Sequence, residues 1–168
     1  MGWTSTAAQF RPFIAALAEM SMNTSELKDK IITAFKNTPF PQGRLTDTFD
    51  DEGVSDYFLG KSWEGHDVSD LRYNSVALSF FEPEAFRYYL PAFMLAELEN
   101  HVAADTIGES IVFHFSRPKK YWENIHEKRL SLFTSSEKEA ILNFLDYMQA
   151  EYGLFEDAVI YASSRLCS

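Results

Sequence analysis

The chain contains little cysteine, glycine or proline, and these shortages exclude several classes of protein. Its single cysteine, Cys167, permits neither an intramolecular disulfide nor a cysteine-based zinc site. We therefore expect a reducing, cytoplasmic setting. Seven glycines and six prolines against fifteen phenylalanines, in 168 residues that are 46% hydrophobic, predict one compact domain rather than a disordered segment.

Long apolar runs and basic residues are also scarce. The sequence has no run of about 18 apolar residues, so we expect no membrane span. Its N-terminus lacks the basic region of a signal peptide. Fifteen basic against 25 acidic residues give a net charge of −10, which argues against binding to nucleic acid or to an anionic membrane. The charge fits a cationic partner, although solubility alone would also explain it.

The motifs of several enzyme classes are missing as well. The chain has no G-x-S-x-G elbow, no P-loop, no G-x-G-x-x-G and no HExxH. Glu123 and His126 have the spacing of a di-iron helix, but no second such pair accompanies them. Glu97 and His101 share a helix face, a spacing typical of a surface ion pair. We therefore expect no metal, no cofactor and no catalytic residue, and hence a protein that is not an enzyme.

The most apolar stretch, residues 80–100, predicts a central helix around which the other elements pack. Its first turn combines Pro83 with flanking acids, which suits the positive end of a helix dipole. Apolar side chains then occupy several sides of the helix, so we expect neighbours all round. Pro91 predicts a kink or a break. The charged residues expected to face outward are Glu84, Arg87, Glu97 and Glu99.

Together the patterns predict an all-α fold, an irregular single-domain bundle of about five to seven helices. Residues 23–168 would form this domain, and 75–80 would be helical or extended rather than a sheet strand. Residues 1–22 form an N-terminal extension whose apolar spacing fits a short amphipathic helix. Ser135 or Ser136 would cap the clearest helix. The other helical patterns span 27–37, 52–59, 68–73, 107–115, 135–152 and 155–166.

An acidic belt, which runs from Asp47 to Asp56 and includes Glu64, Asp67 and Asp70, is the most distinctive surface feature of the sequence. Carboxylates alternate there with aromatic side chains, as in a surface that attracts and anchors a cationic protein. The alternative is that the aromatic side chains point inward and the carboxylates only solvate a loop. The predicted partner-binding residues are Asp47, Asp50, Asp51, Glu52, Asp56, Tyr57, Trp63 and Glu64.

Two motifs, Phe58-x-Gly60-Lys61-x-Trp63 and the PEAFRYYLPA segment at 83–92, resemble a family of small bacterial proteins of unknown function. The resemblance runs from about residue 27 to 145. It implies a mostly helical bacterial cytoplasmic protein and supplies no catalytic residues.

By analogy with small acidic immunity proteins, we expect an inhibitor that binds and neutralises a cognate, cationic toxin through its acidic face. Two alternatives remain open. One is a structural or adaptor protein that forms a homodimer through residues 1–22, and the other is an enzyme with a cryptic site.

Overall fold

The structure is a computed structural model that describes residues 23–46, 53–153 and 156–167. The predicted all-α fold is confirmed, although the described residues form ten α-helices rather than five to seven. The number is higher because one-turn helices such as α3, α5 and α7 fill connections. Over the described ranges there is no strand, only an isolated bridge between Thr46 and Phe81. The elements are α2 (Thr24–Phe35), α3 (Val54–Phe58), α4 (Val68–Tyr73), α5 (Ala77–Phe80), α6 (Pro83–Glu99), α7 (His101–Ala104), α8 (Ile107–Phe115), the 3-10 turn η1 (Lys120–Trp122), α9 (Glu123–Leu132), α10 (Ser135–Tyr152) and α11 (Glu156–Leu166).

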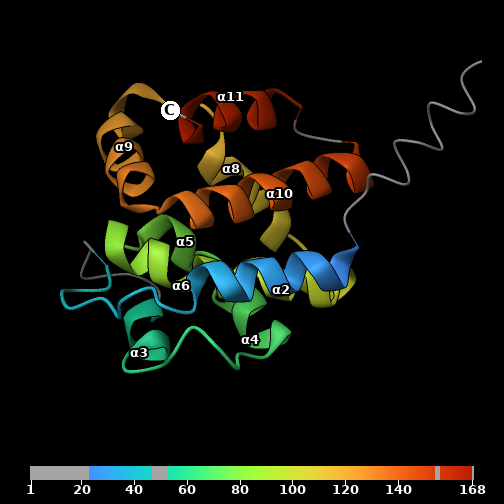
Figure 1. Cartoon of the computed structure of the whole chain (residues 1–168). Coiled ribbons are helices and arrows are strands. Elements are labelled where there is room, and N and C mark those ends of the chain that lie inside the picture. The colour runs from blue at the N-terminus through green and yellow to red at the C-terminus, as the bar shows by residue number, and fades with distance from the viewer. Residues whose placement is uncertain (1–22, 47–52, 154–155, 168) are drawn as a thin grey trace, which may run out of the picture.

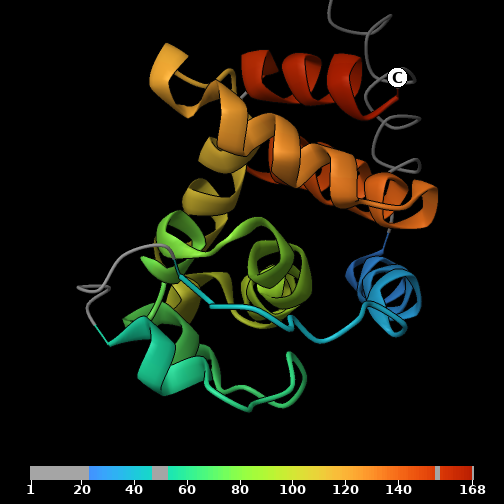
Figure 2. The ribbon, with the colours of Figure 1, turned by 90° about the vertical axis from the view of Figure 1, so that its left-hand side faces the viewer.

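The helices are stacked in layers around α6. Figures 1 and 2 show α11 over α10, with α2 and α6 side by side below them and α3 and α4 at the opposite end. Helix α6 contacts α2, α4, α7, α8 and α9. Its central position confirms the expectation drawn from the apolar stretch at residues 80–100.

Helix α6 is buried on all sides and continues through Pro91. Twelve of its 17 residues are buried. Of the kink and the break that were expected at Pro91, the break is wrong, because the helix is a single element from Pro83 to Glu99, and the kink stays a prediction. Proline removes one backbone hydrogen bond, and the apolar packing around the helix offsets that loss.

The polar groups of α6 must be satisfied inside the protein, and Arg87 shows how. Arg87 was expected to face solvent, but its guanidinium forms a bidentate ion pair with the carboxylate of Glu137 on α10. Arg87 Nε lies 3.0 Å from Oε2, and Nη2 lies 3.0 Å from Oε1. The Glu137 carboxylate, 1% exposed, also accepts a 2.6 Å hydrogen bond from Thr38 Oγ1. This one carboxylate therefore joins α6, α10 and the chain after α2.

The carboxylate of Glu137 also takes part in capping the N-terminus of α10. Glu137 Oε2 accepts a 2.7 Å hydrogen bond from the amide of Thr134, whose hydroxyl accepts one from the amide of Glu137 in return. This reciprocal arrangement is a capping box. The prediction that Ser135 or Ser136 caps the helix is wrong by one or two residues, because the side chain that accepts a hydrogen bond from the first turn is that of Thr134.

The expectation that Glu97 faces solvent is also wrong. Glu97 was predicted to form a surface ion pair with His101, and it does bond to His101 Nδ1. However, its side chain is buried and accepts a 3.0 Å hydrogen bond from the amide of Gly108, at the start of α8. A Cβ atom on Gly108 would lie 2.7 Å from Glu97 Cδ. Any other residue at this position would have to displace the buried Glu97 carboxylate and the end of Met148, whose Cε would lie 2.5 Å from the added atom.

Tyr89 is the third polar group of α6 and holds the connection between α3 and α4. Its hydroxyl lies 3.0 Å from the carbonyl of Phe58 and 2.9 Å from that of Lys61. The ring stacks on Phe81, with ring centroids 5.2 Å apart. The two motifs noted in the sequence thus contact each other, because Tyr89 belongs to one and both carbonyls to the other.

We expect Glu137→Gln to lower the free energy of unfolding by about 3 kcal/mol, because the change leaves the guanidinium of Arg87 half-buried without its counter-ion. Urea unfolding followed by circular dichroism measures the loss. Glu139→Gln, at an exposed position of the same helix, is the matched control and should change the value by less than about 0.5 kcal/mol. Equal effects of the two variants would contradict the assigned role of Glu137.

Tyr89→Phe should cost about 1–2 kcal/mol, since it leaves the Phe58 and Lys61 carbonyls without their shared donor. The control is Tyr73→Phe, at a side chain that is 85% exposed. Amide hydrogen exchange should also become faster in residues 58–63 of Tyr89→Phe alone. Unchanged exchange there would show that the hydroxyl does not hold this connection.

Candidate functional site

The structure describes half of the predicted partner-binding residues. Asp56 and Tyr57 lie on α3, and Trp63 and Glu64 lie in the connection to α4. Asp56 and Glu64 are exposed, as a binding surface requires, and Tyr57 is half-buried. The other four, Asp47, Asp50, Asp51 and Glu52, lie outside the described residues.

Trp63 belongs to the core and does not serve as a surface anchor. Its side chain is only 4% exposed. The hydrogen bonds that Tyr89 donates hold the connection against α6, so the ring that follows is turned inward. For this aromatic residue the inward alternative considered from the sequence is therefore the correct one.

Tyr57 extends the acidic belt toward α4. Its hydroxyl donates to His66 Nδ1 at 2.9 Å, while His66 Nε2 lies 2.8 Å from the carbonyl of Ser62. Burial raises the pKa of Tyr57, and the nearby carboxylates of Asp70 and Asp67 raise it further. These two carboxylates therefore lie close to Tyr57, and with Asp56 and Glu64 they make up what we call the acidic surface.

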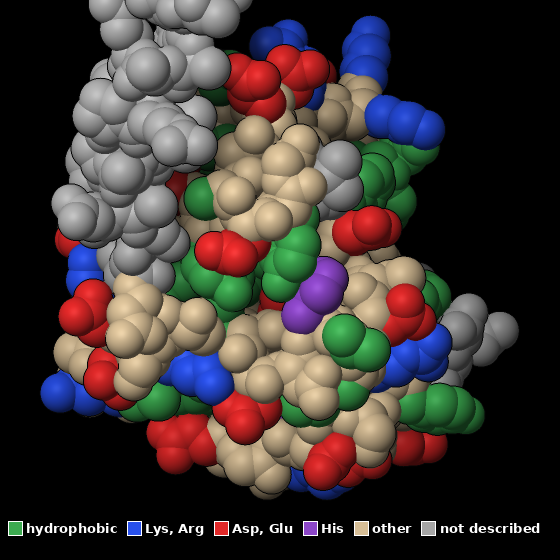
Figure 3. Space-filling model, turned by 90° about the vertical axis from the view of Figure 1, so that its right-hand side faces the viewer, with side chains coloured by type: hydrophobic (Ala, Val, Ile, Leu, Met, Phe, Trp, Pro, Cys, Tyr) green, Lys and Arg blue, Asp and Glu red, His purple; other side chains and the backbone are tan. Residues whose placement is uncertain are grey.

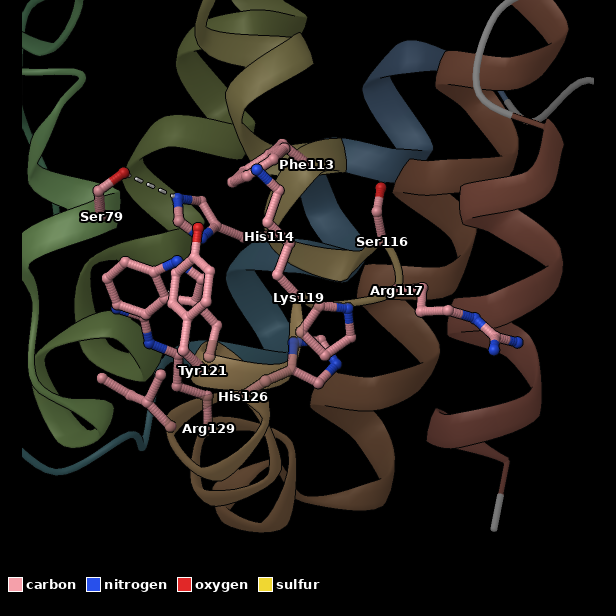
Figure 4. A pocket seen from close by; sticks show the side chains of 12 residues that line it. Ser79, Phe113, His114, Ser116, Arg117, Lys119, Tyr121, His126 and Arg129 are labelled. Carbon is pink, nitrogen blue, oxygen red and sulfur yellow. Dashed lines mark hydrogen bonds between the residues drawn. The ribbon is translucent and has the colours of Figure 1, made fainter.

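A second candidate site lies where α5, α8 and α9 meet. A cavity of about 280 Å³ opens there and is lined by the end of α8, the connection after it and one face of α9 (Figure 4). In the sequence, residues 119–129 contain four of the 15 basic residues, Lys119, Lys120, Lys128 and Arg129, and we predicted no site there. The lining residues that matter for its chemistry are His114, Lys119, Tyr121, Trp122, His126 and Arg129.

Arg129 is the central charge of this cavity. Its side chain is 7% exposed, and Nη2 donates a 2.6 Å hydrogen bond to the carbonyl of Phe81. The guanidinium carbon lies 4.2 Å from the ring centroid of Phe86. Burial lowers the pKa of Arg129 to about 10, an effect that the carboxylate of Glu82 opposes. The side chain is therefore a buried cation at neutral pH.

Two histidines beside Arg129 are neutral. His114 Nδ1 accepts from Arg129 Nη1 at 3.3 Å, and its Nε2 lies 3.4 Å from Ser79 Oγ, the bond drawn in Figure 4. Burial is the main cause that lowers the pKa of His114 to about 3, and the neighbouring Arg129 and His126 contribute to the same shift. Burial also lowers the pKa of His126, with Glu127 acting in the opposite direction. The cavity therefore has one strong positive charge and not three.

Arg117 and Lys119, the other two cations that line the cavity, do not contribute a buried charge as Arg129 does. Arg117 points away from Arg129 and His114 in Figure 4, and its guanidinium carbon lies 5.5 Å from the ring centroid of Tyr161 on α11. Lys119 lines the cavity and is exposed. Within the described residues, no group of three His, Cys, Asp or Glu side chains could hold a metal ion. The chemistry available to the cavity is thus recognition of a negative charge next to aromatic surface.

The model of a family of unknown function, DUF6714, matches residues 23–157. The chain belongs to this family. The resemblance to a family of unknown function is thereby confirmed, and the match covers the range of residues that suggested it. No curated protein and no solved structure matches the chain.

Membership in DUF6714 assigns no activity, so the function has to be argued from the surface and the cavity. No helix in the described part of the chain is long and apolar enough to cross a membrane. The predicted helix at 1–22, and a homodimer formed through it, concern residues that the structure does not describe and stay predictions.

The depressed pKa of His114 makes stability depend on pH. An unfolded chain would protonate this histidine near its ordinary pKa of 6.5, whereas the folded chain does so only at about 3. The contribution of neutral His114 to the free energy of unfolding is therefore fully present above about pH 6.5. It should decrease as the pH falls from there toward about 3, by up to about 1.4 kcal/mol per pH unit.

His114→Gln removes this titration but keeps an acceptor for Arg129. As the pH falls from about 6.5 to about 4, the free energy of unfolding should therefore decrease more for the parent than for this variant. Urea titrations of both proteins across this range measure it. Parallel pH profiles would show that His114 titrates normally.

Proposed function

We propose that this protein is a non-catalytic inhibitor of the immunity type, which binds a basic toxin through the acidic surface. The observation that carries the proposal is uncompensated charge. Among the ion pairs of the described residues, none involves Asp56, Glu64, Asp67 or Asp70. All four carboxylates are exposed. One cation, Lys61, lies within this surface, over the ring of Tyr57 at 3.7 Å from its centroid. Four carboxylates against one cation leave an excess of negative charge, which speeds the encounter with a partner of the opposite sign.

Apolar side chains are available beside these charges as anchors. Leu59 directly follows α3 and Tyr73 ends α4, and both are among the exposed large hydrophobic residues. Helices α3 and α4 lie at the same end of the molecule in Figures 1 and 2. Figure 3 shows the side of the molecule opposite to α3, where acidic side chains along the lower edge are interspersed with a few basic ones. Charge for the encounter and apolar contact for the bound state are what a protein-binding surface combines.

Arg72 limits the acidic surface on one side. It forms an ion pair with Asp105, which follows α7. This pair is exposed on both sides and contributes little to stability. Because Arg72 pairs with Asp105, it does not neutralise the carboxylates on α3, on the connection after α3 and at the start of α4. These carboxylates mark the surface where a cationic partner would bind.

The test begins with capture of the partner by the tagged full chain from its native cells at low salt. The captured protein is then purified, and its association rate is measured by stopped-flow mixing. The double variant Asp56→Lys with Glu64→Lys should lower this rate about tenfold or more at low salt and much less at high salt. The control is Glu156→Lys with Asp157→Lys, an equal charge change on exposed positions of α11, which lies at the other end of the molecule.

A supporting result also requires that the captured protein is basic and that the chain inhibits its activity. An association rate that is the same for both double variants would remove the acidic surface from the mechanism. A partner whose activity the chain does not change would overturn the inhibitor role.

A further inference from the structure

The cavity beside Arg129 holds a buried positive charge that no carboxylate of the described residues contacts; Glu82 acts on it only from beyond ion-pair distance. Buried charges in proteins are normally paired, as Arg87 is with Glu137 in this same molecule. The carbonyl of Phe81 and the ring nitrogen of His114 are neutral acceptors, so they bond to the guanidinium without neutralising it.

Two polar atoms at this cavity also lack hydrogen-bond partners. Arg129 Nε and His126 Nε2 are both buried and without a partner among the described residues. The two residues stand three positions apart on α9, a spacing that places them on the same face of the helix, and both line the cavity. Orphaned buried polar groups are rare in native proteins, and a missing ligand is one cause. Here they occur at the wall of an open cavity.

The outer part of the cavity is aromatic. Phe113, Tyr121 and Trp122 line it, and all three are among the exposed large hydrophobic residues of the chain. The rings of Tyr121 and Trp122 lie 5.6 Å apart between centroids. Pockets that combine apolar and aromatic walls with a few fixed polar groups are typical of small-molecule sites. The volume of about 280 Å³ fits a small ligand.

We propose that this cavity binds a small organic carboxylate with an apolar or aromatic body. The carboxylate lies toward the guanidinium of Arg129, and the body lies against Tyr121 and Trp122. A single negative charge matches the single buried cation, because His114 and His126 are neutral. A phosphate dianion would bring a second charge that the interior does not balance. This site is on α8 and α9 and does not depend on the proposed function of the acidic surface.

The ligand chemistry is distinguishable from a purely structural role of Arg129. The hydrogen bonds from Arg129 to the Phe81 carbonyl and to His114 use Nη2 and Nη1, which leaves the N–H group of Nε without an acceptor among the described residues. A brace for the Phe81 carbonyl would also need neither an open cavity beside the charge nor aromatic side chains at its mouth. The net charge of −10 further disfavours unspecific attraction of anions, so carboxylate binding at this place requires a local cause.

The test uses the full chain and isothermal titration with 4-phenylbutyrate, and with its neutral isostere 4-phenylbutanamide. The carboxylate should bind, and the amide should bind at least about tenfold more weakly, because it cannot form a charge-assisted hydrogen bond with the guanidinium. A panel of naphthyl and alkyl carboxylates extends the search if the phenyl compound is too small, and inorganic phosphate tests the competing chemistry.

Variants then locate the site. Tyr121→Ala with Trp122→Ala changes only exposed or half-exposed rings, so it should fold normally and bind at least about tenfold more weakly. Tyr73→Ala, at an exposed ring on α4, is the matched control and should bind as the parent does. Arg129→Gln is informative if its thermal midpoint stays near that of the parent, and it should then abolish the preference for carboxylate over amide.

Three results would overturn the proposal. The first is equal affinity for the carboxylate and the amide, which would make the cavity a merely apolar one. The second is binding of inorganic phosphate in preference to every organic carboxylate. The third is either no binding of any carboxylate of the panel at millimolar concentration or unchanged binding by the Tyr121→Ala and Trp122→Ala double variant.

Discussion

A helix that is buried on all sides cannot turn its polar groups toward water, and this constraint organises the fold. Helix α6 carries three such groups in its interior positions, and each is satisfied by a different neighbour. Arg87 pairs with Glu137 on α10, Tyr89 donates to the carbonyls of the connection after α3, and Glu97 accepts from the amide of Gly108 on α8. Unpaired, each would carry the cost of desolvation without compensation. The position of three surrounding segments therefore follows from the polar residues of the central helix as much as from its apolar ones.

The sequence predicts the apolar part of this arrangement well. Helical spacing and a proline in the first turn are local signals, so α6 and the all-α class follow from a few residues at a time. Partners of buried polar groups are not local. Arg87 and Glu137 are 50 positions apart, and nothing in the spacing of either helix indicates that they meet. For the same reason Glu97 was predicted to lie at the surface. Its spacing from His101 is a local signal, whereas its contact with the amide of Gly108, 11 positions away, becomes visible only in the fold.

The candidate sites differ in how visible they are in sequence. The acidic belt is a run of carboxylates and is evident by composition, but composition does not show that Trp63 turns inward. That outcome depends on hydrogen bonds that Tyr89 donates from another helix. The basic residues at 119–129 are also visible in the sequence, and yet nothing in their spacing indicates a cavity. Only the fold brings His114 and Phe86 against Arg129, and only the packed structure shows which polar atoms remain without partners.

The central claim is that polar groups with partners inside the protein hold the fold, whereas Arg129 Nε and His126 Nε2, which lack partners at the cavity wall, mark a binding site. Nitrogen-15 spectra of the arginine side chains test it most directly, because Arg87 Nε has a partner and Arg129 Nε does not. Addition of 4-phenylbutyrate should move the Nε–H signal of Arg129 and leave that of Arg87 in place. If the carboxylate binds and the Arg129 signal stays where it was, or if both signals move alike, the claim is wrong.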